Sequence, residues 1–276
     1  MQPSQSSKVA EFRRLHAARP LVLPNAWDAG SARLMEQAGA KAIATTSAGI
    51  SWSHGLPDGQ KLTRDEMLAV IGRIVRRVQV PVTADIEGGY GSGTPTDVAD
   101  TVRAVLALGV AGINLEDSPG RDGQKLLDSQ QQAERIAAAR EAARTAGCEL
   151  LINARTDVYL FGVGAPESRL AETLRRAAAY RAAGADCVFV PGVIDRDTIA
   201  TLAKQIACPL NIMAMPGAPS TAELGALGVA RVSVGPTLTQ AAFATIRRAS
   251  RELLVQGTYG KAEDLLAFSE LGPLFS

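Results

Sequence analysis

The sequence predicts a (β/α)₈ barrel, and two observations carry that prediction. Short hydrophobic segments typical of strands alternate with helical segments at a spacing of about 25 to 40 residues, which is typical of a parallel sheet. Eight such units in about 250 residues fit a closed barrel. An open, doubly wound sheet is the competing fold, but no G-x-G-x-x-G follows the first strand. No linker rich in Pro, Gly or Ser divides the chain, so we expect a single domain over residues 1–276, with 237–276 as a C-terminal helical extension.

The predicted strands are short apolar runs bounded by turn residues. We expect them at 21–24, 42–45, 82–86, 112–116, 150–154, 187–190, 209–213 and 231–234. The predicted helices cover about 5–18, 28–39, 63–78, 95–108, 129–146, 167–183, 195–206 and 220–227. Asp28 is a typical N-cap, and Pro95 suits a first helical position. Residues 47–60 are expected as a polar loop, and the tail as helix with a break near 257–260.

Composition and charge argue against several classes of function. The chain is 46% hydrophobic and 21% charged with a formal net charge of +1, which gives no reason to expect nucleic acid or an anionic membrane surface as a partner. No apolar run reaches the roughly 18 to 20 residues of a membrane span, and the N-terminal segment lacks the apolar core of a signal peptide. Cys148, Cys187 and Cys208 have no metal-site spacing, and we expect buried packing residues in a reducing, cytoplasmic setting.

Carboxylates follow two neighbouring predicted strands. Asp85 and Glu87 end one strand before a glycine-rich turn, and Glu116 and Asp117 end the next. Because side chains alternate along a strand, Asp85 and Glu87 can point the same way. Active sites of barrels lie at the C-terminal strand ends, where these acids would meet Asp58 from the loop after the second strand. Anions gathered at one mouth repel unless a cation compensates, and hard oxygen ligands favour Mg²⁺ or Mn²⁺.

Other polar residues at the same strand ends indicate the ligand. Arg155 is the natural complement, because its guanidinium binds a carboxylate or phosphate through two hydrogen bonds; a structural ion pair is the alternative. A ligand with one carboxylate for Arg155 and adjacent carboxylate and carbonyl oxygens for the cation is a 2-oxo acid. The turn at 45–49, Thr-Thr-Ser-Ala-Gly, supplies hydroxyls and amides for these oxygens. Asn211 follows from the seventh strand, whereas Asp117 or Asp157 can each be interpreted singly as a helix cap or loop brace.

The motifs at these strand ends resemble those of the isocitrate lyase/phosphoenolpyruvate mutase superfamily. The matching pieces are GLPD (55–58), D-x-E-x-G-Y-G (85–91), LED (115–117), ARTD (154–157) and PLN (209–211), in the family's order over nearly the whole chain. The resemblance implies a (β/α)₈ barrel that stabilises a pyruvate-like enolate while a C–C or P–C bond breaks or forms. It also implies a homo-oligomer, a dimer or a dimer of dimers, that exchanges C-terminal helices between neighbours.

The resemblance also implies a set of site residues. Asp85 would bind Mg²⁺ (or Mn²⁺) directly, and Asp58, Glu87 and Glu116 would hold it mainly through waters. The catalytic residues implied are Asp58, Glu116 and Arg155. The substrate-binding residues implied are Thr46, Ser47, Ala48, Asp85, Arg155 and Asn211.

The chain departs from the family pattern in its loops. Lyase members carry K-K-C-G-H after the fourth strand, where the cysteine protonates the leaving enolate, but here the loop 118–128 reads SPGRDGQKLLD. A lyase glutamate after the sixth strand is replaced by Pro191-Gly192, and a lysine of the phosphonate branch is matched only loosely by Lys125. The Ser-Gly turn of relatives is Thr-Ser-Ala-Gly here. These departures argue against efficient cleavage of isocitrate or methylisocitrate.

The leading hypothesis is a Mg²⁺-dependent lyase or decarboxylase that acts on a small 2-oxo or 2-hydroxy di- or tricarboxylate through a metal-stabilised enolate. Such an enzyme would be isocitrate or methylisocitrate lyase-like, or oxaloacetate decarboxylase-like. The alternatives are a P–C bond enzyme of the phosphoenolpyruvate mutase or phosphonopyruvate hydrolase type, and a 2-oxo-acid binding protein with little turnover. Water could replace the missing loop cysteine as proton donor; Tyr90, Tyr159 and His54 are weaker candidates, since each can equally be a packing or solvated residue.

Overall fold

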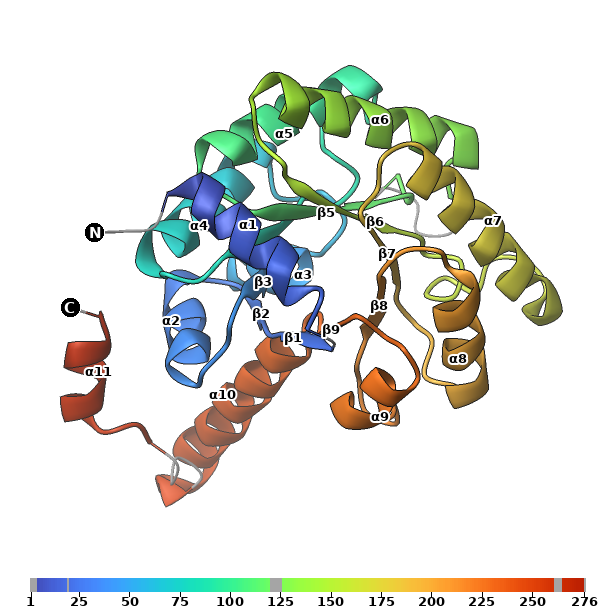
Figure 1. The fold of residues 1–276 in the computed structure, drawn as a ribbon. Helices are drawn as coiled ribbons and strands as arrows, with labels where there is room; N and C mark the ends of the chain where they lie inside the picture. Colours follow the sequence, from blue (N-terminus) through green and yellow to red (C-terminus); the bar gives the residue numbers. More distant parts are fainter. Residues whose placement is uncertain (1–3, 19, 120–125, 261–264, 276) are drawn as a thin grey trace.

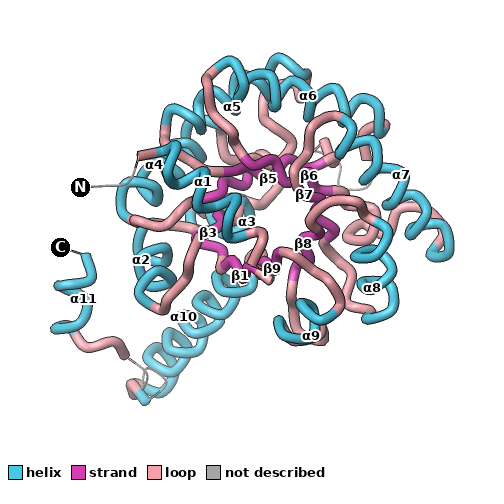
Figure 2. Tube along the Cα trace, viewed as in Figure 1, coloured by secondary structure: helices cyan, strands magenta, loops and turns pink. Residues whose placement is uncertain are grey.

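The computed structural model describes residues 4–18, 20–119, 126–260 and 265–275. Its strands form one parallel sheet that curls into a ring with helices outside it, as Figure 1 and Figure 2 show. The strands are β1 (Leu21–Leu23), β2 (Asn25–Ala26), β3 (Ile43–Thr45), β4 (Val82–Asp85), β5 (Gly112–Glu116), β6 (Leu151–Arg155), β7 (Cys187–Val190), β8 (Leu210–Met213) and β9 (Arg231–Ser233). The predicted (β/α)₈ class is confirmed.

The ring is joined at the first predicted strand, which the structure splits at Pro24 into β1 and β2. β1 pairs with β9, whereas β2 pairs with β3. The side chain of Asn25 links the two sides, because its Oδ1 accepts from Val234 N (2.9 Å) and Gly235 N (3.0 Å) while its Nδ2 donates to Thr45 O (3.0 Å). One expected strand is therefore two, since proline lacks the N–H that an unbroken ladder needs.

The helices cover the outside of the ring, and most begin at a side-chain cap. They are α1 (Gln5–Leu15), α2 (Ala29–Gln37), α3 (Ser47–Ser53), α4 (Arg64–Arg77), α5 (Pro95–Ala107), α6 (Ser129–Thr145), α7 (Arg169–Ala182), α8 (Arg196–Gln205), α9 (Thr221–Ala226), α10 (Thr237–Gln256) and α11 (Phe268–Phe275), with a 3₁₀ turn, η1 (Pro166–Ser168), before α7. In α2, α4, α5, α6 and α9 the N-cap and the third helical residue satisfy each other's backbone N–H groups. Among the described residues, no helix has both the length and the apolar character of a membrane span.

One helix corrects the sequence prediction. Residues 47–53, expected as part of a polar loop, form α3, which begins where Thr46 Oγ1 accepts from Gly49 N (3.3 Å). Serine and glycine are weak helix formers, so propensity alone favours the loop. Residues 47–51 are nevertheless buried against the barrel, and this packing outweighs the propensity.

α1 seals the N-terminal end of the barrel. Phe12 is fully buried and packs with Leu23 and Leu151. Lys8 reaches past it, and its Nζ donates to Val78 O (3.1 Å), just before β4. Because this end is closed, the C-terminal strand ends are the open side of the barrel.

The barrel interior is polar just below those open strand ends. Asn153 Nδ2 donates to Asn114 Oδ1 (2.8 Å) and to Asn211 Oδ1 (3.0 Å), so one amide joins β5, β6 and β8. Arg231 reaches across from β9, and its Nη2 donates to Asn114 Oδ1 (3.1 Å). Branched apolar side chains usually fill this space, so the polar layer is a departure that calls for an explanation.

α10 is a 20-residue helix that extends away from the barrel (Figure 1), and several of its apolar side chains are exposed. The exposed ones are Leu238, Phe243, Ile246, Leu253, Leu254 and Val255. α11 lies beside α2, where Leu274 is buried and its carbonyl accepts from Arg33 Nε (3.1 Å). Apolar surface gathered along one helix in this way is typical of a region that another chain covers.

His16, directly after α1, gives the fold a pH dependence. The ring is 6% exposed; Nδ1 lies 2.8 Å from Phe12 O, and Nε2 has no hydrogen-bond partner within the described residues. Burial, with the Arg231 charge adding to it, lowers the pKa of His16 to about 4. The unfolded chain takes up this proton at the ordinary histidine pKa, so acid favours unfolding.

We therefore expect His16 to remove on the order of 3 kcal/mol from the free energy of unfolding as the pH falls from about 6.5 to about 4. The whole contribution is present above this window and lost below it. His16→Gln should flatten this part of the profile, measured as the difference in urea-unfolding free energy between variant and wild type across the window. Parallel profiles would contradict the assignment.

Candidate active site at the barrel mouth

The predicted acidic residues meet at the C-terminal strand ends, here called the mouth. Asp85 ends β4 and Glu87 follows it, while Glu116 ends β5 directly opposite Arg155 at the end of β6. All four side chains are largely buried. Neighbouring parallel strands have thus brought together residues that are far apart in the sequence, as predicted.

Asp85 is held in place by backbone N–H groups. Its Oδ2 accepts from Ser47 N (3.2 Å) at the start of α3, and its Oδ1 accepts from Glu87 N (3.3 Å). Its own N–H donates to Thr45 Oγ1 (2.8 Å). The first turn of a helix has N–H groups without intrahelical partners, so the unexpected helix α3 is what orients this carboxylate.

Glu87 sits on strained backbone. In the described part of the chain, the non-glycine residues with left-handed φ are Gln60 (57°), Glu87 (49°) and Tyr90 (63°). The other two both contact Glu87: Gln60 N donates to Glu87 Oε2 (2.5 Å), and Tyr90 OH donates to Glu87 Oε1 (3.0 Å). Backbone strain of this kind costs about 1 to 3 kcal/mol per residue and gathers at functional sites. Burial, then the charges of Asp85 and Asp58, raise the pKa of Glu87 to about 7.

Arg155 is clamped between two carboxylates. Its Nη1 lies 2.7 Å from Glu116 Oε2 and its Nε 2.6 Å from Asp157 Oδ1. Desolvation opposes the charge of Arg155, but Asp157 and Glu116 outweigh it and raise the pKa of the guanidinium. The structural ion pairs weighed for Arg155 are therefore present. Its Nη2 has no hydrogen-bond partner among the described residues, so one arm of the guanidinium remains for a ligand.

The carboxylates around Asp85 have raised pKa values. Burial is the largest cause for Asp58, Glu87 and Glu116, and in each case the Asp85 charge adds to it. Arg155 opposes the increase at Glu116 without cancelling it. Asp58 keeps an exposed edge at the rim, and its carboxylate faces the Ser47 side chain. A bound cation relieves repulsion of this kind, and the all-oxygen donor set suits Mg²⁺ or Mn²⁺.

The hydrogen bonds of the acids at the mouth limit how these acids could hold a cation. Within the described ranges, no three Asp, Glu, His or Cys side chains form a ready-made ligand set. The oxygens of Glu87 and Glu116 already accept hydrogen bonds from protein groups. This arrangement fits one direct carboxylate, Asp85, with the other acids acting through waters, which Mg²⁺ readily retains.

The remaining predicted residues fall into two groups. Ser47 lies against Asp85, and Ala48 follows it in the first turn of α3. Thr46 is the N-cap of α3. Asn211 lies deeper, in the polar layer, where its Nδ2 donates to Ile212 O (2.9 Å). Substrate contact by these residues stays a prediction.

The sequence analysis did not predict the buried residues that support Arg155 and Asp157 from below. Asp117 is fully buried; its Oδ1 accepts from Asp157 N (3.0 Å), and its Oδ2 accepts from Arg176 Nη1 (3.0 Å) and Tyr180 OH (2.7 Å). Asp117 therefore braces a loop, as one interpretation of it held. Its partners lie four residues apart on one face of α7, and that spacing was their only signal in the sequence.

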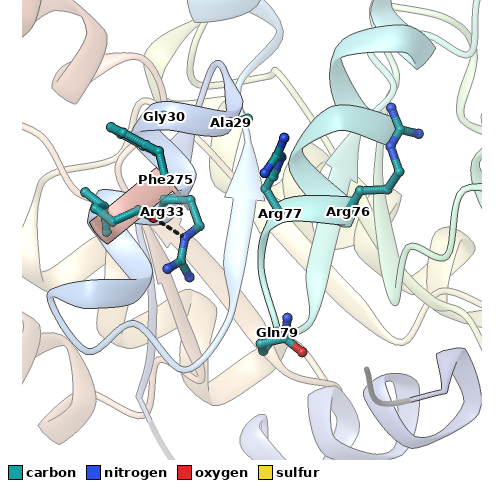
Figure 3. A pocket seen from close by; sticks show the side chains of 8 residues that line it. Ala29, Gly30, Arg33, Arg76, Arg77, Gln79 and Phe275 are labelled. Atoms are coloured by element: carbon teal, nitrogen blue, oxygen red, sulfur yellow. Dashed lines mark hydrogen bonds between the residues drawn. The ribbon is translucent and has the colours of Figure 1, made fainter. Parts of the chain in front are cut away.

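Two cavities can be compared with the mouth. One of about 570 Å³ opens on the outer surface between α2, α4 and the end of α11, with Arg33, Arg77 and Phe275 in its wall (Figure 3). It shares no residue with the mouth. A cavity of about 110 Å³ beside Gln60 and Gly88 adjoins Glu87. Buried charge, rather than cavity volume, marks the candidate site.

Two loop positions bear on the choice of reaction. Residues 120–125, which include Lys125, lie outside the described residues. Pro191-Gly192 stands in the segment where the lyase pattern has a glutamate; the φ of Gly192 is +84°, and an added Cβ there would lie 2.7 Å from Leu160 Cα. Since backbone occupies that space, the position cannot take a longer side chain without a shift of the chain.

Sequence and fold both match proteins of one family. Residues 12–254 match the family model described as phosphoenolpyruvate phosphomutase. The chain belongs to this family. A protein of Mycobacterium tuberculosis is 41% identical over 236 residues, 86% of this chain and 85% of its own. The 2-methylisocitrate lyase of Bacillus subtilis is 30% identical over 216 residues, 76% of this chain and 68% of the lyase. A crystal structure from Burkholderia cenocepacia has a TM-score of 0.91 at 39% identity, covering 98% of this chain and 97% of its own.

Other members of the phosphoenolpyruvate phosphomutase family differ in the bond that they cleave. Similar proteins include 2,3-dimethylmalate lyase of Eubacterium barkeri and an oxaloacetate decarboxylase of Pseudomonas putida. Solved structures include phosphonopyruvate hydrolase with oxalate and Mg²⁺, at a TM-score of 0.85, 27% identity and coverage of 97% and 94%. The family match confirms the superfamily resemblance read from the strand-end motifs.

Gly192→Ala should lower the free energy of unfolding by about 1 to 3 kcal/mol beyond the cost of a left-handed alanine, because the new methyl group meets the Leu160 backbone. The matched control is Gly147→Ala, whose φ is +65° and whose added Cβ meets nothing within 4 Å. Urea unfolding of both variants measures the difference. Equal losses would show that the contact with Leu160 costs nothing.

Proposed function

We propose that this member of the phosphoenolpyruvate phosphomutase family is a Mg²⁺-dependent lyase or decarboxylase that acts on a small 2-oxo or 2-hydroxy di- or tricarboxylate. The observation that carries the proposal is the arrangement at the mouth. Asp58, Glu87 and Glu116, whose pKa values are raised, lie around Asp85, and Arg155 faces them with its Nη2, since its contacts with the described residues use Nε and Nη1. Negative charge for a cation and positive charge for a carboxylate thus lie side by side.

Asp85 would hold the cation directly, and Asp58, Glu87 and Glu116 would hold its waters. When bound, Mg²⁺ supplies positive charge that stabilises negative charge on the substrate oxygens. The protein's part is orientation. Backbone N–H groups fix Asp85, and the Gln60 and Tyr90 hydrogen bonds fix Glu87, so the acids need not rearrange when a ligand arrives.

Arg155 would orient the substrate carboxylate. Its Nε and Nη1 are held by Asp157 and Glu116, and Asp157 N is in turn fixed by Asp117. A guanidinium locked in this way loses little side-chain entropy when Nη2 binds a ligand, so it favours one pose of the reacting carbon. Ser47 lies next to the same site, because its N–H group donates to Asp85 Oδ2.

The family relatives support cleavage of a C–C bond, because lyases and a decarboxylase are among them. The loop 118–128 of this chain contains neither cysteine nor histidine. We therefore propose that the product takes its proton from water. Pro191-Gly192, which lacks the lyase glutamate, supports a substrate other than isocitrate.

The second candidate is cleavage of a P–C bond. It is favoured by the family model and by the similarity to phosphonopyruvate hydrolase. Arg155 and the cation site would bind a phosphonate as well as a carboxylate. Release of inorganic phosphate from phosphonopyruvate would select this candidate over the first.

We further propose that the chain works in the cytoplasm as a homo-oligomer, a dimer or a dimer of dimers. The exposed apolar side chains of α10 support assembly through the 237–276 extension, and a homotetramer is the largest assembly proposed. Cys148, Cys187 and Cys208 form no disulfide within the described residues, which suits a reducing compartment.

The proposed function is tested by titration calorimetry and product assays on the same preparation. Oxalate, 2-oxoglutarate and oxaloacetate are titrated with and without Mg²⁺, and candidate substrates are assayed for pyruvate, glyoxylate and CO₂. Mg²⁺-dependent binding with release of a C–C cleavage product supports the enzyme. Tight Mg²⁺-dependent binding without any turnover would favour a 2-oxo-acid binding protein instead.

Asp85→Ala should abolish Mg²⁺-dependent binding of oxalate, because it removes the only carboxylate proposed to contact the cation directly. The control is Asp195→Ala, which removes an acid that caps α8 on the surface. Calorimetry of oxalate with and without Mg²⁺ measures the effect. Unchanged affinity in Asp85→Ala would remove the metal assignment.

Arg155→Ala should weaken carboxylate ligands by about 2 to 5 kcal/mol, the scale for removing one partner of a buried charge pair. Part of the loss arises because the substitution leaves Glu116 and Asp157 without the arginine charge that pairs with them. Arg140→Ala, at an arginine paired with Asp186 away from the mouth, is the matched control. A loss below a few tenths of a kcal/mol, within the range of a surface substitution, would return Arg155 to a purely structural role.

A further inference from the structure

We propose that Arg231 is a positioning residue: a buried cation beneath the mouth that sets the balance between metal affinity and carboxylate affinity at the site above it. This inference rests on the proposed function, since it concerns the same site. It assigns a role to a residue that the strand-end motifs do not include.

Arg231 points from β9 into the barrel. Its side chain is fully buried, and its Nη2 donates to Asn114 Oδ1 (3.1 Å) on β5. Figure 2 shows β9 and β5 on opposite sides of the ring. On the closed side, the guanidinium carbon lies 5.9 Å from the centre of the Phe12 ring. Asn114 pairs with Asp85 on β4 and precedes Glu116 by two residues on β5. The guanidinium is therefore bonded to the residue that pairs with Asp85, two residues before Glu116 on the side of the closed end.

Arg231 has poor compensation within its own layer. Its Nε and Nη1 have no hydrogen-bond partner in the described part of the chain, and the side chain that it does bind is an amide. Arg176, also buried, differs because it forms an ion pair with Asp117 at 3.0 Å. Holding a guanidinium in the interior without a carboxylate costs free energy, so packing alone favours an apolar residue here.

The charge of Arg231 persists despite this cost. Desolvation lowers the pKa of Arg231 to about 10, opposed by Cys187 and then by Asp85, so the side chain remains cationic at neutral pH. Asp85 is thus the carboxylate on which this cation acts, and it belongs to the mouth. The carboxylate that balances the buried charge of Arg231 therefore belongs to the site and not to the surrounding scaffold.

The sign of the effect follows from Coulomb's law. A positive charge below Asp85 weakens the binding of a cation above it and strengthens the binding of an anion, and the interior screens the interaction little. Arg231 thereby keeps cation affinity below its maximum and preserves attraction for the substrate carboxylate. It also offsets part of the repulsion among the acids when no ligand is bound.

The test compares Arg231→Met with Arg231→Lys in the full-length protein. Methionine removes the charge and keeps much of the volume, whereas lysine keeps the charge. Calorimetry measures the Kd for Mn²⁺, and then the Kd for oxalate at saturating Mn²⁺. We expect Arg231→Met to bind Mn²⁺ more tightly by on the order of tenfold and oxalate more weakly by a similar factor. Arg231→Lys should stay within about twofold of wild type for both.

A merely structural role predicts a different result. It predicts that Arg231→Met weakens both ligands together with the fold, whereas the proposal predicts opposite changes in the two affinities. Arg140→Met makes the same change in net charge at the Asp186 ion pair and should leave both affinities unchanged. Thermal unfolding of each variant confirms that the compared proteins are folded.

A second variant keeps the proposal testable if Arg231→Met does not fold. Asn114→Asp leaves Arg231 in place but sets a carboxylate against its Nη2, so it should shift both affinities in the same directions as Arg231→Met. Unchanged affinities, or a joint loss of both, in either folded variant overturns the role of Arg231. A wild-type protein that binds no Mn²⁺ overturns the proposed function itself, which is a distinct outcome.

Discussion

Negative charge buried at one end of a barrel is the constraint to which the rest of the structure responds. Burial favours the neutral forms of Glu87 and Glu116, whereas hydrogen-bond donors of the chain orient these side chains and Asp85. Arg155 neutralises one side of the cluster. The left-handed backbone at Glu87 is part of the same arrangement, because strain persists only where surrounding contacts enforce it.

The division between strand ends and loops explains both the family match and its limits. Strand ends fix the acids and Arg155 through backbone register, so they hold side by side the groups that we propose bind a cation and a carboxylate. Loops decide which substrate completes the site and where its proton comes from. The Pro191-Gly192 segment shows how firmly a loop can differ, since it lacks the lyase glutamate and backbone of the preceding loop fills the space beside Gly192. Membership in the phosphoenolpyruvate phosphomutase family therefore defines a type of chemistry more closely than a reaction.

The sequence predicted most of the fold because the barrel is built from regular alternation, which hydrophobic periodicity and helix stops reveal directly. The sequence also predicted that Asp85, Glu116 and Arg155 lie at one edge, because the C-terminal ends of parallel strands all lie at the same edge of a sheet. It failed at α3, where burial overrides the weak helix propensity of serine and glycine, and at Pro24, where one strand is two. Contacts across the barrel were out of reach, because no local pattern distinguishes a buried polar residue from an exposed one.

The way in which the ring is joined has a consequence for evolution. Between β9 and β3, the side-chain amide of Asn25 makes hydrogen bonds in place of main-chain pairing. Its oxygen accepts from the residues after β9, and its nitrogen donates to β3. Few other side chains offer an acceptor and a donor at that length. A survey of inactivating substitutions would thus identify position 25 alongside the residues of the site. The loss of the Asn25 side chain would nevertheless act by opening the ring of strands that carries the site residues.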